Sequence, residues 1–302
     1  MTVNWNTLRG SELNSEYLPA VPELSDAGLH TILLPRPETE AESVTIRLAN
    51  TEGQRNRANM LLNRMYSWRG YGDDHELPAT PDCITFTASS NDHLVGTLTL
   101  TVDSGSGLAA DQTFPDDIER FRQAPGAKLC ELTKFAFDSS APSRPRLAAL
   151  FHIIFIYGSH HYNCTDLFIE VNPRHRRYYQ AMLGFVPVGE LKTNAAVGAP
   201  SQLMWLNVAE IRRQIDLHAN ENATAGRSLY PYFFSSREEE GIYSRLVKRV
   251  PDESLAEGPF AVDSPGRSLL RSQLSAAPTA AADQPITWPM LLPMSIAPAA
   301  QS

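Results

Sequence analysis

Four residues late in the chain combine a spacing and side chains that suit chemistry. Asn172 ends an apolar run, Tyr179 follows seven positions later, and Gly184 and Phe185 come twelve and thirteen positions after the asparagine. An asparagine amide donates and accepts hydrogen bonds, and a tyrosine hydroxyl can donate a proton. Gly184 permits the left-handed turn by which a chain leaves a helix, and Phe185 suits the start of a buried strand. An ordinary helix–turn–strand with a core aromatic residue would show the same pattern, so both interpretations stay open.

The elements that must position these residues are a strand, a long helix and a second strand. Hydrophobic patterning predicts strands at 128–138 and 166–171, an apolar helix at 143–161 between them, and a further helix at 174–183. A strand–helix–strand unit of this kind makes the two strands parallel, with a right-handed crossover.

More strands and helices are expected on both sides of this unit. Strands are predicted at 43–49, 82–89, 93–103, 185–190 and 203–206, with a short one at 29–34. Helices are predicted at 51–68, 113–122, 208–218 and 237–248. Because antiparallel strands precede and follow the parallel pair, the predicted fold class is α+β, with a mixed, mostly antiparallel central sheet.

Composition and charge exclude several classes of protein. The net charge of -8 lies at the ends, because residues 1–42 carry two Arg against seven acids and residues 251–302 carry two Arg against five. This balance does not suit a nucleic-acid binder, which normally shows a basic domain. We expect neither a transmembrane helix nor a secretory signal. Three widely spaced cysteines fit a reducing cytoplasm and predict no metal site.

The composition also divides the chain into four segments. We expect an irregular N-terminal arm at 1–42, one domain at 43–218, a helical extension at 219–250 and a disordered tail rich in Pro and Ala at 251–302.

The Asn172-Tyr179-Gly184-Phe185 spacing resembles the last motif of the GNAT acyltransferase superfamily. The resemblance implies a GNAT-like sheet with helices on both faces, whose parallel pair splays. It also implies that Asn172 binds an amide of a pantetheine arm and that Tyr179 points towards the thioester sulfur. Typical relatives hold the pyrophosphate of coenzyme A on a glycine-rich loop, whereas residues 139–146 contain no glycine. This difference favours the phosphopantetheine of acyl carrier protein over acyl-CoA as donor.

A closer resemblance rests on longer strings. CELTKFAFD, LAALFHIIFIYG and CTDLFIEVNPRHRRYYQAMLGF are similar to the long-chain N-acyl amino acid synthases, relatives of the acyl-homoserine lactone synthases, over about 44–213. This family implies transfer of a long acyl chain from acyl carrier protein to the α-amine of an amino acid. The lactone synthases place Glu and Arg three apart, where this chain has Glu131 and Lys134.

Direct attack of an amine on a thioester assigns roles to the strand at 128–138. Glu131 is the predicted general base, although a structural ion pair would also explain it. Glu131 and Lys134 would point to opposite faces of a regular strand, so they cooperate only across a bulge. A backbone N–H of Phe135, Ala136 or Phe137 would hold the oxyanion. Tyr179 would protonate the leaving thiolate, unless it is a packing residue.

Substrate and partner contacts complete the prediction. A docking patch for acidic acyl carrier protein is predicted at Arg144, Arg146, Arg174, Arg176 and Arg177, against the alternative of a solvated face. Arg57, Trp68 and Arg69 are candidates for the acceptor's carboxylate. Phe151 and Phe155, with Phe135 and Phe137, are candidates for the acyl slot.

Three alternatives remain open: a GNAT N-acetyltransferase using acetyl-CoA, an acyl-homoserine lactone synthase, and a lipid-binding or scaffold module without catalysis. These alternatives are distinguished by which acyl donor the protein uses, which acceptor it acylates and which product it forms.

Overall fold

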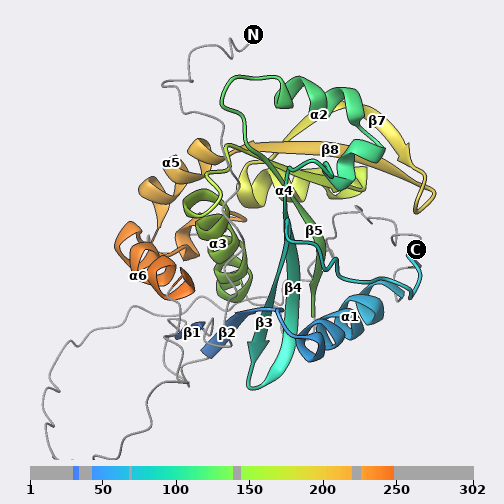
Figure 1. The fold of residues 1–302 in the computed structure, drawn as a ribbon. Helices are drawn as coiled ribbons and strands as arrows, with labels where there is room; N and C mark the ends of the chain where they lie inside the picture. The colour runs from blue at the N-terminus through green and yellow to red at the C-terminus, as the bar shows by residue number, and fades with distance from the viewer. Residues whose placement is uncertain (1–29, 34–42, 68–69, 139–143, 220–225, 248–302) are drawn as a thin grey trace, which may run out of the picture.

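The centre of the fold is the unit β5 (Leu129–Phe137), α3 (Arg144–His160) and β6 (Asp166–Val171), seen in the computed structural model (Figure 1). The two strands pair in parallel, which confirms the predicted unit. Every residue of α3 from Arg146 to Gly158 is buried, as expected for a helix that is apolar on all sides.

The structure describes residues 30–33, 43–67, 70–138, 144–219 and 226–247. The strand predicted at 29–34 is present as β1 (His30–Leu33). The rest of the predicted arm at 1–42 and the whole tail at 251–302 lie outside the described residues.

Eight strands form one sheet in the order β1-β2-β3-β4-β5-β6-β8-β7. All neighbouring pairs except β5–β6 are antiparallel, so the predicted mixed sheet is confirmed. The hairpin of β7 and β8 is longer than predicted, and β8 pairs with β6 while β7 lies outside it. The other strands are β2 (Ser43–Leu48), β3 (Cys83–Ser90), β4 (His93–Val102), β7 (Val186–Asn194) and β8 (Ala199–Asn207).

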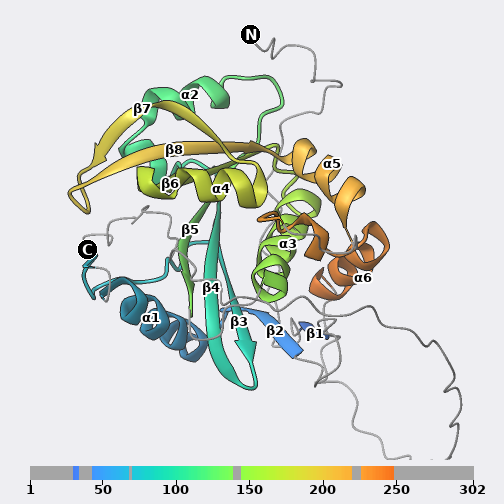
Figure 2. The same ribbon diagram turned by 180° about the vertical axis from the view of Figure 1, so that it is seen from behind.

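Helices cover both faces of the sheet. α1 (Glu52–Ser67) packs on β4 and β5 from one side, and α3 lies on the opposite side (Figures 1 and 2). Around α3 stand α4 (Arg176–Leu183), α5 (Val208–His218), the 3-10 turn η4 (Tyr230–Tyr232) and α6 (Ser236–Val247). The face of the sheet that α1 covers also carries the turn η2 (Ala109–Gln112) and α2 (Pro115–Arg122), which pack near β6 and β8.

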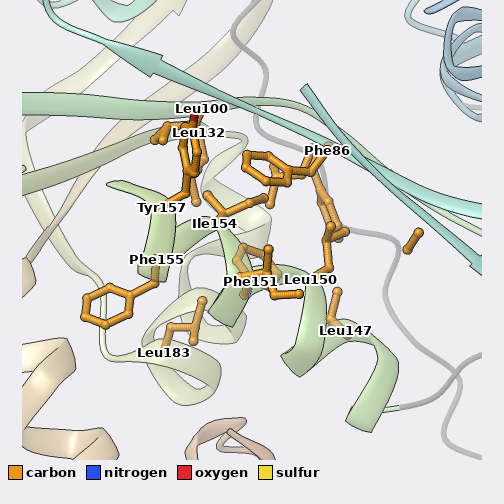
Figure 3. Packing of buried hydrophobic residues seen from close by; sticks show 14 of the residues in the cluster. Phe86, Leu100, Leu132, Leu147, Leu150, Phe151, Ile154, Phe155, Tyr157 and Leu183 are labelled. Carbon is orange, nitrogen blue, oxygen red and sulfur yellow. The ribbon is translucent and has the colours of Figure 1, made fainter. Parts of the chain in front are cut away.

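The two faces of β4 differ in chemistry because threonine and leucine alternate along it. Leu98 and Leu100 are buried against α3, where Leu100 and its neighbour Leu132 face the helix (Figure 3). Thr97, Thr99 and Thr101 point to the opposite face, because successive side chains of a strand alternate. The sheet therefore has an apolar side under α3 and a polar, buried side towards α1.

The C-terminal extension is fixed to α3 by a buried polar cluster. His152 donates from Nε2 to Glu239 at 2.9 Å and accepts at Nδ1 from the N–H of Phe234 at 2.9 Å. Arg212 donates to both oxygens of Glu239, at 2.8 and 2.6 Å. The ring of Phe233 stacks on His152 at 4.4 Å. Leu229, Tyr230, Phe233 and Ile242 of this extension belong to the same hydrophobic core as α3. In the part of the chain described, no helix combines the length and apolar character needed to cross a membrane.

Candidate active site

The two parallel strands separate after three residue pairs. Pairing runs from Leu129 opposite Asp166 to Glu131 opposite Phe168. Beyond that point β5 continues beside β4 alone. The N–H of Asp138 donates to Val95 of β4 at 2.7 Å, so the N–H of the preceding Phe137 points the other way, into the opening between β5 and β6. Of the three predicted oxyanion donors, Phe137 therefore has an N–H group that points into this opening.

A bulge interrupts β5 at Lys134. Thr133 pairs with Thr99 and Ala136 pairs with Thr97, so Lys134 and Phe135 both lie opposite the single residue between those threonines. Lys134 has φ 51°, an unusual left-handed conformation for a residue with a side chain. The bulge on which cooperation of Glu131 and Lys134 depends is therefore present.

Lys134 is almost completely buried, with 2% of its surface exposed. Burial lowers the pKa of its ammonium from 10.5 to about 8, although Cys83 and Glu76 act in the opposite direction. Cys83 contacts the hydroxyl of Thr101, which pairs with Glu131. Because Lys134 is near Cys83, and Cys83 and Thr101 share the face of Glu131, Lys134 and Glu131 lie on the same polar face of the sheet.

Glu131 is fully buried and accepts a hydrogen bond from the backbone of η2. The N–H of Ala110 donates to its Oε2 at 3.1 Å. The carboxylate is held by an element that sequence patterning did not predict. The role of Glu131 as a general base stays a prediction.

The polar face contains more hydroxyls than the sequence analysis considered. Thr85 and Thr99 share a hydrogen bond at 2.7 Å, and Thr87 donates to the carbonyl of Arg47 at 3.3 Å. The buried Oγ1 of Thr97 has no hydrogen-bond partner among the described residues. The alternation TLTLTV was the signal for this face, because it places every threonine on one side.

His75 closes this face from a loop. Two asparagines of α1 hold the loop: Asn63 exchanges two hydrogen bonds with the backbone of His75, and Asn59 accepts from Leu77. His75 Nε2 donates to the carbonyl of Tyr71 at 2.9 Å, so Nδ1 carries the lone pair. Within the described residues this buried Nδ1 lacks a partner, and burial lowers the pKa of His75, with Lys134 acting in the same direction. Nothing in the sequence distinguished His75 from other loop residues.

A second buried carboxyl group lies beside the opening. Glu170 of β6 accepts hydrogen bonds from Asn194 at 2.8 Å and Ser201 at 2.6 Å. Burial raises the pKa of Glu170, although the hydrogen bonds from Ser201 and Asn194 lower it. A Glu inside the apolar strand DLFIEV was a readable signal that the sequence analysis missed. Among the described residues, no group of three or more His, Cys, Asp or Glu side chains is placed to hold a metal ion.

The predicted motif after β6 is present as a turn and a short helix. Asn172 is half-buried, and its Oδ1 accepts from the N–H of Arg174 at 3.2 Å, at the start of the turn η3 (Pro173–His175). Gly184 has φ 85°, which confirms the predicted left-handed exit. Tyr179 is buried in the core between Tyr178 and Phe185. Its role towards a thiolate stays a prediction.

The predicted docking patch is only partly at the surface. Arg174 and Arg177 are exposed, and Arg144 and Arg176 are half-buried. The prediction for Arg146 is wrong, because only 5% of its surface is exposed and it faces the interior from the first turn of α3. The side chains that stay at least partly at the surface are those of Arg144, Arg174, Arg176 and Arg177, and their role in docking stays a prediction.

Of the predicted acceptor residues, the structure describes Arg57 alone. Arg57 is exposed on α1, whereas Ala58, Leu61 and Leu62 of the same helix are buried, so the predicted role of Arg57 is not supported. Trp68 and Arg69 lie outside the described residues. A helical stripe alone did not show which side of α1 Arg57 would occupy.

An apolar cavity lies on the opposite side of β5 from Glu131. It lies between the sheet and α3 and is partly open to solvent. Phe151 and Phe155 line it, while the ring of Phe135 lies 5.5 Å from that of Phe151 and Phe137 lies against Gly96. Their role in binding an acyl chain stays a prediction. Other lining residues are Leu100, Cys130, Leu132, Ile154, Gly158 and Phe233.

Comparison with known proteins identifies a family model and several solved structures. The family model for N-acyl amino acid synthase FeeM matches residues 57–207. The structure of FeeM, an N-acyl amino acid synthase from uncultured soil microbes, is 28% identical, with 56% of this chain and 94% of that chain covered and a TM-score of 0.52. No curated protein matches the chain.

Two further solved structures share less. The AHL synthase LasI is 12% identical, with 55% of this chain and 90% of that chain covered and a TM-score of 0.43. An acyl-CoA N-acyltransferase from Pseudomonas aeruginosa is 15% identical, with 54% and 98% covered and a TM-score of 0.39.

The separating parallel pair within a mixed sheet, taken with the family match, defines an N-acyltransferase of GNAT fold. More narrowly, the chain belongs to the FeeM family of N-acyl amino acid synthases.

Proposed function

We propose that this protein transfers a long-chain acyl group from the thioester of acyl carrier protein to the α-amine of an amino acid. One arrangement carries the proposal. An apolar cavity and a buried polar face occupy opposite sides of β5, and both reach the point where β5 and β6 separate. A thioester in the opening would have its acyl chain on one side and the attacking amine on the other.

The apolar side suits a hydrocarbon chain. The cavity is lined almost entirely by carbon, and its lining includes Leu132, the first residue of β5 beyond the paired region. Each buried methylene contributes about 0.8 kcal/mol, so a chain of many carbons gains far more from such a cavity than an acetyl group does. This supports a long-chain donor over acetyl-CoA.

The polar side suits the amine. The α-ammonium must lose a proton before attack, and Glu131 is the proposed acceptor of that proton. The neutral nitrogen then attacks the thioester carbonyl carbon, an N–C bond forms and the C–S bond breaks. The second nitrogen proton is lost as the amide forms, and the departing thiolate takes one proton, for which Tyr179 is the proposed donor. The balance is ammonium plus thioester to amide, thiol and one proton.

Two groups on β5, a backbone donor and a charged side chain, support the transition state in this proposal. The N–H of Phe137 points into the opening and would donate to the oxyanion. Lys134 is mostly protonated at neutral pH, because its pKa is about 8, and it adds positive charge on the face of Glu131.

Two features favour the carrier protein as donor. The segment 139–146 contains no glycine that would bring backbone N–H groups close to a pyrophosphate. Arg174 and Arg177 are exposed beside Asn172 and offer positive charge to an acidic carrier protein.

The test is a donor and acceptor comparison with the full chain. Purified protein is incubated with a long-chain acyl-carrier protein, with the acyl-CoA of the same chain or with acetyl-CoA. Each of the common amino acids, or S-adenosylmethionine, is supplied as acceptor, and products are identified by mass spectrometry. We expect an N-acyl amino acid and free carrier-protein thiol. Exclusive use of acetyl-CoA, formation of a lactone from S-adenosylmethionine, or no transfer from any donor would each overturn the proposal.

A further inference from the structure

Gly158 occupies an unusual position in α3. Its neighbours on the helix are large and apolar, and the glycine itself is buried near the end of a helix of 17 residues. Glycine inside a helix is about 1 kcal/mol less favourable than alanine. A glycine here therefore needs a reason in the surroundings.

Steric crowding is not that reason. A Cβ built at Gly158 would come no closer than 3.5 Å to Leu100 and 4.0 Å to Cys164, which are ordinary contacts. At Gly96, by contrast, a Cβ would meet the ring of Phe137 at 2.7 Å. Gly158 also lacks a positive φ. Alanine would therefore fit at position 158 both in its contacts and in its backbone conformation. Its methyl group would reduce the space in the cavity that Gly158 lines.

The position of Gly158 along the cavity follows from helix geometry. Phe151, Ile154, Phe155 and Gly158 line the cavity from one face of α3. Phe151 packs on Phe135, which lies in the part of β5 that has left β6. Gly158 is about 10 Å further along the helix axis. It lies beside Cys164, two residues before the paired start of β6 at Asp166. Gly158 therefore marks the end of the cavity remote from the opening.

We propose that Gly158 sets the length of acyl chain that the protein accepts, by leaving the remote end of the cavity open. This inference rests on the proposed function, because it assigns the cavity to the donor's hydrocarbon chain. A side chain at this position would occupy the space of the terminal carbons and leave the rest of the cavity unchanged. The opening, Glu131 and Lys134 lie elsewhere, so the chemistry itself is not altered.

The experiment compares three full-length proteins: wild type, Gly158→Ala and Gly158→Leu. The matched control is Gly53→Ala, since Gly53 is an exposed glycine of α1 with nothing within 4 Å of an added Cβ. Binding of free fatty acids from eight to eighteen carbons is measured by calorimetry. The chain length of N-acyl products formed from a mixture of acyl-carrier proteins is measured by mass spectrometry. Thermal unfolding checks each variant for folding, and Gly158→Ala is expected to fold because its Cβ makes ordinary contacts.

We expect Gly158→Ala to weaken binding of the longest chains by about fourfold for each methylene that no longer fits, with short chains unaffected. Gly158→Leu shortens the preferred chain further, and Gly53→Ala keeps the wild-type profile. Identical chain-length profiles for wild type and a folded Gly158→Ala would overturn the inference. A shifted binding profile without any transfer to amines would support the inference and overturn the proposed function. Absence of fatty-acid binding to the wild type would overturn the inference even if acyl transfer occurs.

Discussion

The N–H of Ala110 donates to Oε2 of Glu131 at 3.1 Å, so the short turn η2 fixes the carboxylate on β5. η2 is itself held from α2: Arg122 donates to Asp111 of the turn at 2.8 Å and to Asp103 beyond β4 at 2.7 Å. A chain of contacts thus runs from an exposed helix to the buried acid at the proposed reaction centre.

Replacement of Glu131 by glutamine tests the proposed base. Glu131→Gln keeps the size of the side chain and can still accept from Ala110, but it cannot take the amine's proton. We expect the rate of transfer to fall at least about a hundredfold while the unfolding temperature stays near that of wild type. Steady-state assays with acyl-carrier protein and thermal unfolding measure both. Glu190→Gln, at an exposed position of β7, is the control, and full activity of Glu131→Gln would remove Glu131 from the mechanism.

The buried ammonium of Lys134 predicts a pH dependence of stability. Its folded pKa is about 8 and its ordinary value is 10.5, so between these values the unfolded chain binds more protons than the folded one. The free energy of unfolding should therefore gain a contribution of up to about 3 kcal/mol as pH rises through this window, and none below it. Urea titrations of wild type and Lys134→Met at several pH values isolate the difference. Parallel pH profiles for the two proteins would contradict the assigned pKa.

Charge reversal tests the carrier-protein surface. The double variant Arg174→Glu, Arg177→Glu should weaken binding of acyl-carrier protein at least about tenfold and reduce its dependence on salt. Binding is measured by calorimetry at two ionic strengths. Arg237→Glu serves as control because it reverses an exposed charge in the first turn of α6, where an acid is well tolerated. Equal loss in the control would assign the effect to net charge.

The cluster around Glu239 predicts how firmly the C-terminal extension is attached. Burial raises the pKa of Glu239, but hydrogen bonds from His152 and Arg212 outweigh it and hold the pKa at about 2. The carboxylate's contribution to stability is therefore present above its ordinary pKa near 4.5 and is lost as pH falls towards 2. Glu239→Ala should lower the free energy of unfolding by about 3 kcal/mol at neutral pH.

Denaturant unfolding with and without a bound fatty acid measures this effect. Because Phe233 stacks on His152 and also lines the cavity, Glu239→Ala should weaken fatty-acid binding as well. The control is Glu240→Ala at an exposed position of the same helix. Unchanged stability of Glu239→Ala would show that the extension is held by its apolar contacts alone.

The regular elements were predictable because their hydrophobic periods are strong. The apolar helix at 144–160, the strand at 166–171 and the left-handed exit at Gly184 all follow from local patterning, and the structure agrees. The length of the β7–β8 hairpin was underestimated because β7 is largely exposed and lacks an alternating apolar pattern. Local patterning also contains no information on the insertion of β8 between β6 and β7.

The site was less accessible to sequence reasoning. Glu131 and the bulge at Lys134 were anticipated, but η2 has no periodic pattern, and it supplies the contact to Glu131. Arg146 and Arg57 show why charge types alone mislead: one turns inward and the other outward from helices whose faces the sequence did not assign correctly. His75 reaches the polar face only through hydrogen bonds between a loop and α1, which no local rule predicts.

The short ladder between β5 and β6 forms a boundary between two parts of the sheet. Five strands lie on one side of this boundary and three on the other, and the ladder between β5 and β6 runs over three residue pairs. The cavity spans this boundary. Leu100, Cys130 and Leu132 line it from the part that contains β4 and β5, and Leu167 and Leu206 line it from the part that contains β6 and β8. A hydrocarbon chain bound there would contact both parts of the sheet at once. Binding of the acyl donor would therefore reduce the relative motion of β5 and β6 at the position where the thioester has to be held.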